Sequence, residues 1–329
     1  DIENEVRGNI PMVYYHVWDN FPAPSFNRGF YESNDEVVCI SKVTHEIVKD
    51  VAPNVNSRYL PHAVNSEIFK KFKTSEDKER LKTLAKTIPG LDDYFEKPQK
   101  SRKKIFFWNN RNARRKQSGT VLWWFKEFLD EVGHDKACLI MHTDARDQHG
   151  QDLPHLIAHH GLDNHQIMLS TQKVDPADLA VLYNLADFTI NIADAEGFGL
   201  ATLESLSCGT PIIVNMTGGL QEQVTNGQEW FGWGIQPSSR AVIGSLQVPY
   251  IYEDRINKDD FINVMKKAIK VSSKSYKKMS DGGINHVKQN YNFENYEKQW
   301  VSVIDEIIER EGSWDNRKNY KRWHLLEVA

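Results

Sequence analysis

The sequence contains few cysteines, no long apolar run and no excess of basic residues. Its three cysteines, Cys39, Cys138 and Cys208, lie in or beside apolar runs and show no metal-ligand spacing, which argues against a disulfide scaffold and is typical of reduced thiols. No apolar segment is long enough to span a bilayer, and the start, DIENEVRGNIP, lacks the basic and apolar regions of a signal peptide. We therefore expect a soluble, cytoplasmic protein.

The charge and composition narrow the class of protein further. The formal net charge of -4 provides no general basic surface for a nucleic acid or an anionic membrane. With 40% hydrophobic and 26% charged residues, the composition is globular rather than disordered. A chain of 329 residues exceeds the size at which one core usually keeps growing, so we expect two domains.

The first part of the chain alternates strand and helix patterns, which predicts parallel pairing with right-handed crossovers. Strands are expected at 11–18, 35–40 and 57–62, and a helix capped by Ser41 at 41–51. These elements form a partial Rossmann-like domain over residues 1–73. A charged stretch from about residue 70 contains one polar helix, and residues 74–104 form the linker between the domains.

A second alternating series occupies residues 105–289. Strands are expected at 104–110, 137–142, 166–170, 187–192 and 211–214, and Asp175 with Pro176 marks the start of one intervening helix. This pattern predicts a doubly wound sheet, in which ligands bind beyond the carboxyl ends of the strands. Residues 228–255 are expected to form loops around a short strand, followed by helices at 258–271, 273–289 and 293–309. The helix and tail at 290–329 are expected to cross back to the first domain.

The segment DAEGFGLATLESLSCGTPIIV, residues 194–214, combines two acids with a glycine turn. Glu196 precedes Gly197 and Gly199, and Glu204 follows on the expected helix, with seven residues between the acids. Glycines let a backbone approach a ligand closely, and a helix amino end favours an anion by roughly 0.3–1 kcal/mol. The two carboxylates then face different parts of one ligand.

The longer segment EGFGLATLESLSCGTPIIVNMTGGLQEQV resembles the nucleotide-sugar site of family 4 retaining glycosyltransferases, which have the GT-B fold. The resemblance implies two Rossmann-like domains with parallel sheets facing a cleft. It also implies that Glu196 contacts hydroxyls of the donor sugar and that Glu204 accepts hydrogen bonds from the ribose. Phe198, Gly199 and Leu200 would offer backbone amides near the diphosphate.

A basic loop, NNRNARRKQSG, follows the strand at 104–110. Members of the family carry an arginine and a lysine at this spacing and bind the donor phosphates with them, which assigns these roles to Arg111 and Lys116. Arg114 and Arg115 share the loop, and either could take the role of the arginine. Two cations can neutralise a leaving diphosphate without a metal ion, so the resemblance implies no metal and no cofactor apart from the nucleotide diphosphate sugar used as donor. The alternative reading is a solvated basic loop.

The first domain offers two candidates for the acceptor side. His16 ends the first expected strand, where the family often has a histidine near the acceptor, and Asp19 follows three residues later. Either side chain could orient the acceptor hydroxyl, although the donor phosphate is commonly thought to receive the proton in such enzymes. The alternative is a histidine that merely packs at a strand end.

The sequence departs from the family at its amino end. Family members have several strand and helix units, including a glycine-rich turn, before the segment that corresponds to residues 14–20. The first domain is thus expected to be incomplete, with an exposed sheet edge. The chain could be the carboxyl-terminal part of a larger protein, a separate chain could supply the missing part, or the domain could be small; we favour the first two explanations.

The main hypothesis is a metal-independent retaining glycosyltransferase that moves a sugar from a nucleotide diphosphate sugar to an acceptor hydroxyl. The acceptor could be a glycan, a protein or a small molecule. The rival hypothesis is an inactive subunit that binds the nucleotide sugar, or a chain that supplies half a site to a partner. Epimerases and phosphorylases share the fold, so the fold alone does not decide the chemistry.

Overall fold

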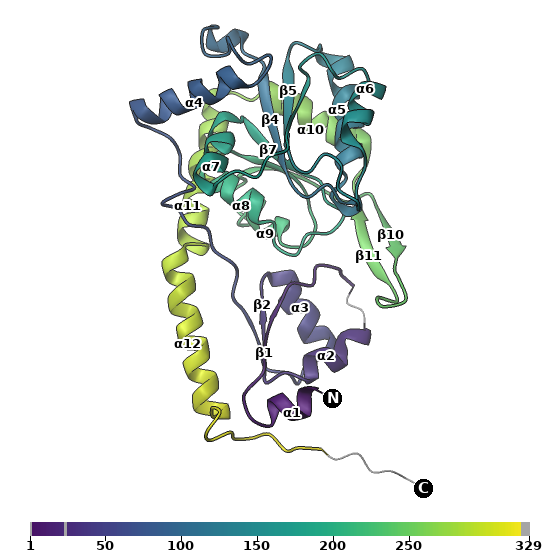
Figure 1. The fold of residues 1–329 in the computed structure, drawn as a ribbon, viewed down its shortest axis with the longest axis vertical. Coiled ribbons are helices and arrows are strands. Elements are labelled where there is room, and N and C mark those ends of the chain that lie inside the picture. Colours follow the sequence, from purple (N-terminus) through teal and green to yellow (C-terminus); the bar gives the residue numbers. More distant parts are fainter. Residues whose placement is uncertain (1, 23–24, 324–329) are drawn as a thin grey trace.

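The computed structural model describes residues 2–22 and 25–323. Residue 1 and residues 23–24 of the expected first domain, and residues 324–329 of the expected tail, lie outside the described residues. Figure 1 shows two α/β units, one above the other, with the amino-terminal unit in the lower part of the view. A linking segment that contains α4 (Ser75–Thr87) and the carboxyl-terminal helices connects them.

The amino-terminal unit contains a three-stranded parallel sheet in the order β1-β2-β3. Its elements are α1 (Ile2–Arg7), β1 (Val13–His16), α2 (Arg28–Glu32), β2 (Glu36–Cys39), α3 (Lys42–Val51) and β3 (Ser57–Tyr59). Ser41 caps α3, as expected, since its side chain accepts a hydrogen bond from the amide of Thr44. Only β2 has a strand on each side, so the β1 edge is open along the described residues.

The carboxyl-terminal unit contains a six-stranded sheet whose strand order is that of the Rossmann fold. The order is β6-β5-β4-β7-β8-β9, and every pairing is parallel. Numbered within the unit, this is 3-2-1-4-5-6, which places the reversal of strand order between β4 and β7. The strands are β4 (Lys104–Asn109), β5 (Ala137–His142), β6 (Ile167–Ser170), β7 (Phe188–Asn191), β8 (Ile212–Asn215) and β9 (Gly232–Ile235).

Helices cover both faces of this sheet, and β4 shows why. Phe106 and Trp108 pack into one core cluster, while Ile105 and Phe107 pack into another on the opposite face. The helices of the unit are α5 (Ser118–Val132), α6 (Leu153–His159), α7 (Pro176–Leu185), α8 (Leu200–Ser207), α9 (Leu220–Val224), α10 (Lys258–Ile269) and α11 (Ser273–Asn290). Both faces are therefore buried, as the apolar strands predict.

The segment at 228–255 differs from the expected loops around one short strand. Besides β9, it forms an antiparallel hairpin of β10 (Ser239–Ile243) and β11 (Ile251–Arg255). That prediction was wrong because SRAVI and IYEDR pair with each other outside the main sheet, so neither carries the continuous apolar run of a buried strand. The hairpin extends from the carboxyl-terminal unit toward the amino-terminal one (Figure 1).

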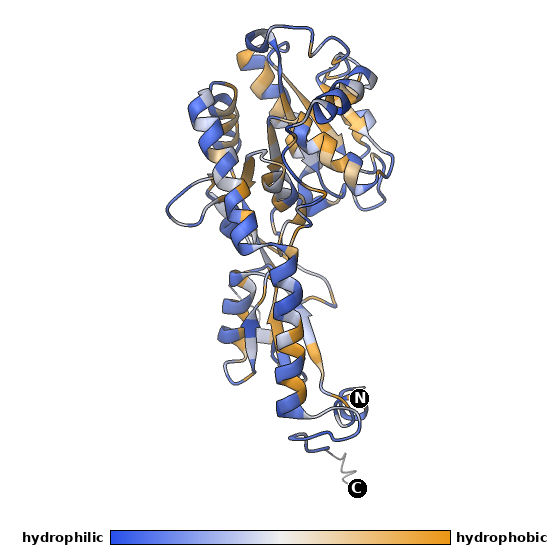
Figure 2. Ribbon diagram, turned by 90° about the vertical axis from the view of Figure 1, so that its left-hand side faces the viewer, coloured by the Kyte–Doolittle hydropathy of each residue, from blue (hydrophilic) through white to orange (hydrophobic). Residues whose placement is uncertain are grey.

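The last helix, α12 (Phe293–Glu311), runs along the amino-terminal unit. Its Val303 and Ile307 pack with Val38 and Leu60 in one buried cluster. Figure 2 shows apolar and polar residues on different sides of this helix. Across residues 2–22 and 25–323, no helix combines the length and apolar character needed to cross a membrane.

Candidate functional site

The reversal of strand order brings two loops together at the carboxyl ends of β4 and β7. In open parallel sheets of this kind, helices leave in opposite directions at the reversal and a crevice remains between them. The loop after β4 carries the basic residues 111–116, and the loop after β7 carries the acidic and glycine residues 194–199. The fold thus joins the two segments that the sequence singles out.

Lys116 and Glu196 form a buried ion pair in this crevice. Nζ of Lys116 donates to Oε2 of Glu196, and Nδ2 of Asn191 donates to the same oxygen at 3.2 Å. The residues are only 8% and 9% exposed, respectively. Burial lowers the pKa of Lys116, although the adjacent Glu196 carboxylate opposes this effect. The charges of Lys116 and Glu196 compensate each other. A ligand anion could replace Glu196 as the partner of Lys116, and a ligand hydroxyl could replace Lys116 as the partner of Glu196.

The glycine turn is held tightly between two other segments. A Cβ on Gly197 would lie 2.5 Å from the carbonyl oxygen of Val17 in the amino-terminal unit, and one on Gly218 would lie 1.9 Å from that of Glu196. Gly199 has a φ of 89° and precedes α8, and among the residues that the structure describes no side chain caps the amino end of this helix. The turn therefore presents backbone at the amino end of α8, and larger residues would force the segments apart.

Glu204 lies on α8 and belongs to a separate hydrogen-bond chain. Oη of Tyr183 donates to its carboxylate at 2.7 Å, and Nδ2 of Asn109 donates to the same Tyr183 oxygen at 2.8 Å. Burial raises the pKa of Glu204 to about 7, against the opposing effect of the Tyr183 hydrogen bond. Its carboxyl group is thus partly protonated near neutral pH.

The arginines of the basic loop have different surroundings. Arg111, with a side chain 58% exposed, forms an ion pair with Asp147 at 2.6 Å. Arg114 makes two hydrogen bonds to Glu253, at 2.6 and 2.8 Å. Arg115 donates to the carbonyl oxygen of Ala195 at 2.6 Å. The structure therefore brings Arg115, and not Arg111, next to Glu196.

The two acceptor-side candidates, His16 and Asp19, have different surroundings. His16 is 2% exposed, and its Nε2 lies 2.8 Å from Oη of Tyr31. Burial lowers the pKa of His16 to about 4, so its ring is neutral, and it packs inside the amino-terminal unit. Burial raises the pKa of Asp19 to about 6, while the charges of Arg115 and Lys116 lower it and that of Glu196 raises it. Asp19 thus lies within electrostatic reach of the ion pair.

Several residues that were not predicted from the sequence also support the site. Gln117, with a φ of 58°, donates to Oδ2 of Asp194 at 2.5 Å, which fixes the basic loop against the acidic one. Asn191 and Glu253 are the others. The position of Asn191 at the end of a strand was the one available signal for it. Within the described ranges, no three His, Cys, Asp or Glu side chains form a group that could hold a metal ion.

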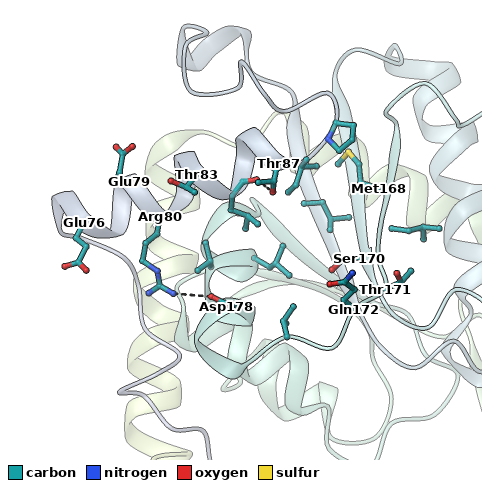
Figure 3. A pocket seen from close by; sticks show the side chains of 18 residues that line it. Glu76, Glu79, Arg80, Thr83, Thr87, Met168, Ser170, Thr171, Gln172 and Asp178 are labelled. Atoms are coloured by element: carbon teal, nitrogen blue, oxygen red, sulfur yellow. Dashed lines mark hydrogen bonds and ion pairs between the residues drawn. The ribbon is translucent and has the colours of Figure 1, made fainter.

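An apolar cavity of about 810 Å³ lies at the β6 edge of the sheet, between α4 and α7 (Figure 3). Met168 and Leu182 contribute to its apolar lining, and Ser170 and Gln172 line it near the carboxyl end of β6. The cavity is on the same side of the sheet as Glu204, because α7 both lines it and carries Tyr183. Its lining includes neither Glu204 nor Tyr183, so the cavity shares a side of the sheet with these two residues without containing them.

A family model described as "Glycosyl transferases group 1" matches residues 92–286. Among curated proteins, the chain is 31% identical over 189 residues to alpha-monoglucosyldiacylglycerol synthase of Streptococcus pneumoniae, a match that covers 57% of this chain and 39% of that protein. It is also 35% identical over 83 residues to glycogen synthase of Mycobacterium tuberculosis, covering 24% of this chain and 19% of that protein. The chain thus spans less than half the length of these relatives.

Solved structures show the same architecture. Anabaena Alr3699/HepE in complex with UDP-glucose superimposes with a TM-score of 0.67 at 13% identity, covering 90% of this chain and 72% of that one. Sucrose-phosphate synthase from Thermosynechococcus elongatus gives a TM-score of 0.64 at 18% identity, covering 86% and 61%. At such identities the likeness concerns the fold, and it confirms the expected GT-B arrangement of two Rossmann-like units.

Proposed function

The chain belongs to the group 1 glycosyl transferases, and we propose that it transfers a sugar from a nucleoside diphosphate sugar to an acceptor hydroxyl, with retention and without a metal ion. We further propose that it is a member of the retaining family 4. The observation that carries the proposal is the buried Lys116–Glu196 pair at the strand reversal. It supplies a cation for phosphate and an acid for sugar hydroxyls in one place.

The proposed diphosphate site combines Lys116, Arg115 and the uncapped amino end of α8. As the bond from the anomeric carbon to the phosphate oxygen breaks, negative charge grows on the diphosphate. Fixed cations and helix amides stabilise such charge without reorganisation, which is typically the largest contribution to catalysis of this kind. These groups would take the place of a divalent cation.

The proposed nucleoside site extends from Glu204 toward β6. Strand spacing places the end of β6 roughly 10 Å from the end of β4, since one strand lies between them. The Glu204 carboxylate would accept hydrogen bonds from the ribose hydroxyls. The apolar cavity near Ser170 offers a surface for the flat base.

In the proposed transfer, the acceptor oxygen bonds the anomeric carbon on the face that the phosphate leaves. The acceptor hydroxyl proton passes to the departing phosphate oxygen, so the products are the glycoside and the nucleoside diphosphate. Glu196 is already paired with Lys116 and Asn191, which favours a role in binding sugar hydroxyls over attack on the anomeric carbon. Asp19 would orient the acceptor hydroxyl.

A test incubates the chain with UDP-glucose, GDP-mannose and ADP-glucose, with and without EDTA. Released nucleoside diphosphate is measured, and the anomeric configuration of the product is read by proton NMR. Nucleotide release that continues in EDTA, with the anomeric configuration of the donor kept in the product, supports the proposal. An inverted product contradicts retention, and loss of release in EDTA contradicts independence of a metal ion.

The three-stranded amino-terminal sheet favours one second candidate, a chain that binds the nucleotide sugar but needs a partner for turnover. Calorimetry with UDP, GDP and ADP separates the two. Binding without release of nucleotide from any donor favours this second candidate.

A further inference from the structure

We propose that the cavity at the base of the β10–β11 hairpin binds the acceptor, and that this acceptor is a neutral carbohydrate; the assignment rests on the proposed function. The cavity has a volume of about 530 Å³ and lies between the two units. Asp19, Val43 and Glu46 line it from the amino-terminal side, and Gln221, Gln236 and Ser238 from the carboxyl-terminal side. A ligand in this cavity would contact both units.

The cavity is next to the proposed donor site. Gly218 lines it, and the same glycine packs so closely on the carbonyl oxygen of Glu196 that a Cβ would lie 1.9 Å away. Asp19 also lines the cavity, within electrostatic reach of Lys116 and Glu196. A hydroxyl of a molecule bound here would therefore face the sugar held by Glu196.

The hairpin forms the outer wall of the cavity and is fixed to both units. Nδ2 of Asn20, a residue only 5% exposed, donates to the carbonyl oxygen of Tyr252 at 2.6 Å, and the rings of Phe26 and Tyr250 meet edge to face at 5.2 Å. On the other side, the amide of Asp254 donates to the carbonyl oxygen of Asp194 at 2.9 Å. These contacts fix the position of the hairpin relative to the loop after β7, which carries Glu196.

The charges in the cavity select against an anionic acceptor. Asp19 and Glu46 carry carboxylates that form no ion pair or hydrogen bond with another side chain among the described residues. Asp254 is already paired with Arg240 at 2.7 Å, so this guanidinium is not available to neutralise them. Three carboxylates, of Asp19, Glu46 and Asp254, line the cavity against the single guanidinium of Arg240, so a phosphate would meet a net negative lining, which disfavours it.

The polar groups in the cavity suit a molecule with several hydroxyls. Carboxylates accept strong hydrogen bonds from hydroxyls, and the amides of Gln221 and Gln236 both donate and accept. An acyl chain would bury these polar groups without partners, which costs free energy. A neutral sugar satisfies them without adding charge, so it fits the cavity better than a sugar phosphate or a lipid.

The experiment measures sugar transfer from the same three donors onto three classes of acceptor. These are neutral sugars (glucose, maltose and sucrose), glucose 6-phosphate, and dioleoylglycerol in phosphatidylcholine vesicles. The Glu46→Gln variant is compared with wild type and with Glu297→Gln, a matched change at an exposed position on α12. We expect transfer to at least one neutral sugar, and an acceptor KM raised about tenfold in Glu46→Gln with kcat little changed. Glu297→Gln should match wild type.

Preferred transfer to glucose 6-phosphate or dioleoylglycerol, or an unchanged acceptor KM in Glu46→Gln, overturns the acceptor assignment. Release of nucleotide without transfer to any acceptor also overturns it, while the proposed donor chemistry stands. Absence of both nucleotide binding and nucleotide release instead refutes the proposed function, so the two failures are distinguishable.

Discussion

Lys116 and Glu196 are separated by 80 positions in the sequence and share a buried hydrogen bond between their charged groups. Their side chains are only 10% and 12% exposed. Because the two residues leave the sheet from β4 and β7, the fold itself places them in contact. Their pairing lets two charged groups stay buried in the absence of a ligand.

The pair should show strong coupling in the free energy of unfolding. Lys116→Met or Glu196→Gln alone leaves the other charge buried without a partner, which should cost about 3 kcal/mol each. The double variant removes both charges and should cost at least about 1 kcal/mol less than the sum. Urea unfolding of the four proteins measures this; additive losses would show that the pair is not coupled.

Arg115 should contribute to donor binding more than Arg111 does. Removing a charged hydrogen-bond donor from the diphosphate site should weaken UDP binding about 10- to 100-fold in Arg115→Ala. The UDP Kd of Arg111→Ala should stay within about threefold of wild type, because the exposed Arg111 pairs with Asp147 and is not part of the proposed diphosphate site. Calorimetric Kd values decide between them, and a larger loss in Arg111→Ala would mean that the basic loop rearranges around the donor.

Gly197→Ala should separate the two units locally. Its new Cβ would lie 2.5 Å from the carbonyl oxygen of Val17, so that backbone must move. We expect at least about a tenfold loss of transfer rate, since small displacements of bound reactants are costly. Gly29→Ala is the control, because no atom of the described residues lies within 4 Å of its Cβ position. Equal transfer rates in Gly197→Ala and wild type would show that the close approach of Gly197 to Val17 is not needed for transfer.

Glu204 should make stability fall as pH rises. Its folded pKa, about 7, lies above the ordinary value of 4.5, so the folded protein binds the extra proton between these values. Proton binding by Glu204 stabilises the folded state fully below pH 4.5. This stabilisation is lost as pH rises toward 7, which lowers the free energy of unfolding by about 3 kcal/mol at most. Glu204→Gln should remove this loss. Unfolding curves at pH 5 and pH 8 measure it, and an equal pH dependence in the variant would contradict the assignment.

The local patterns of the sequence predicted much of the fold. Asp175 and Pro176 marked the start of α7, and the apolar runs at 137–142 and 187–192 predicted β5 and β7. Such signals work because the fixed φ of a proline at a helix start and burial on both faces of a strand act within a few residues. Asp175 occupies the N-cap position of α7, although its side chain accepts no capping hydrogen bond. The hairpin could not be predicted in this way, since its strands pair with each other outside the buried sheet.

The candidate site was predicted in part, for a similar reason. Lys116 and Glu196 lie in short motifs whose spacing the sequence displays, and the structure brings them together. The orientation of Arg111 and Arg115 depends on distant partners, Asp147 and Ala195, which no local pattern reveals. The burial of His16 against Tyr31 likewise results from packing between β1 and α2.

The role of Lys116 is tested by the rate of nucleoside diphosphate release from the preferred donor by Lys116→Ala, with Lys100→Ala as an exposed control. If Lys116 stabilises the leaving diphosphate, kcat should fall about 10²- to 10³-fold in Lys116→Ala and stay unchanged in the control. A kcat for Lys116→Ala within about twofold of wild type, in a protein that still unfolds cooperatively, would show that Lys116 does not stabilise the leaving diphosphate.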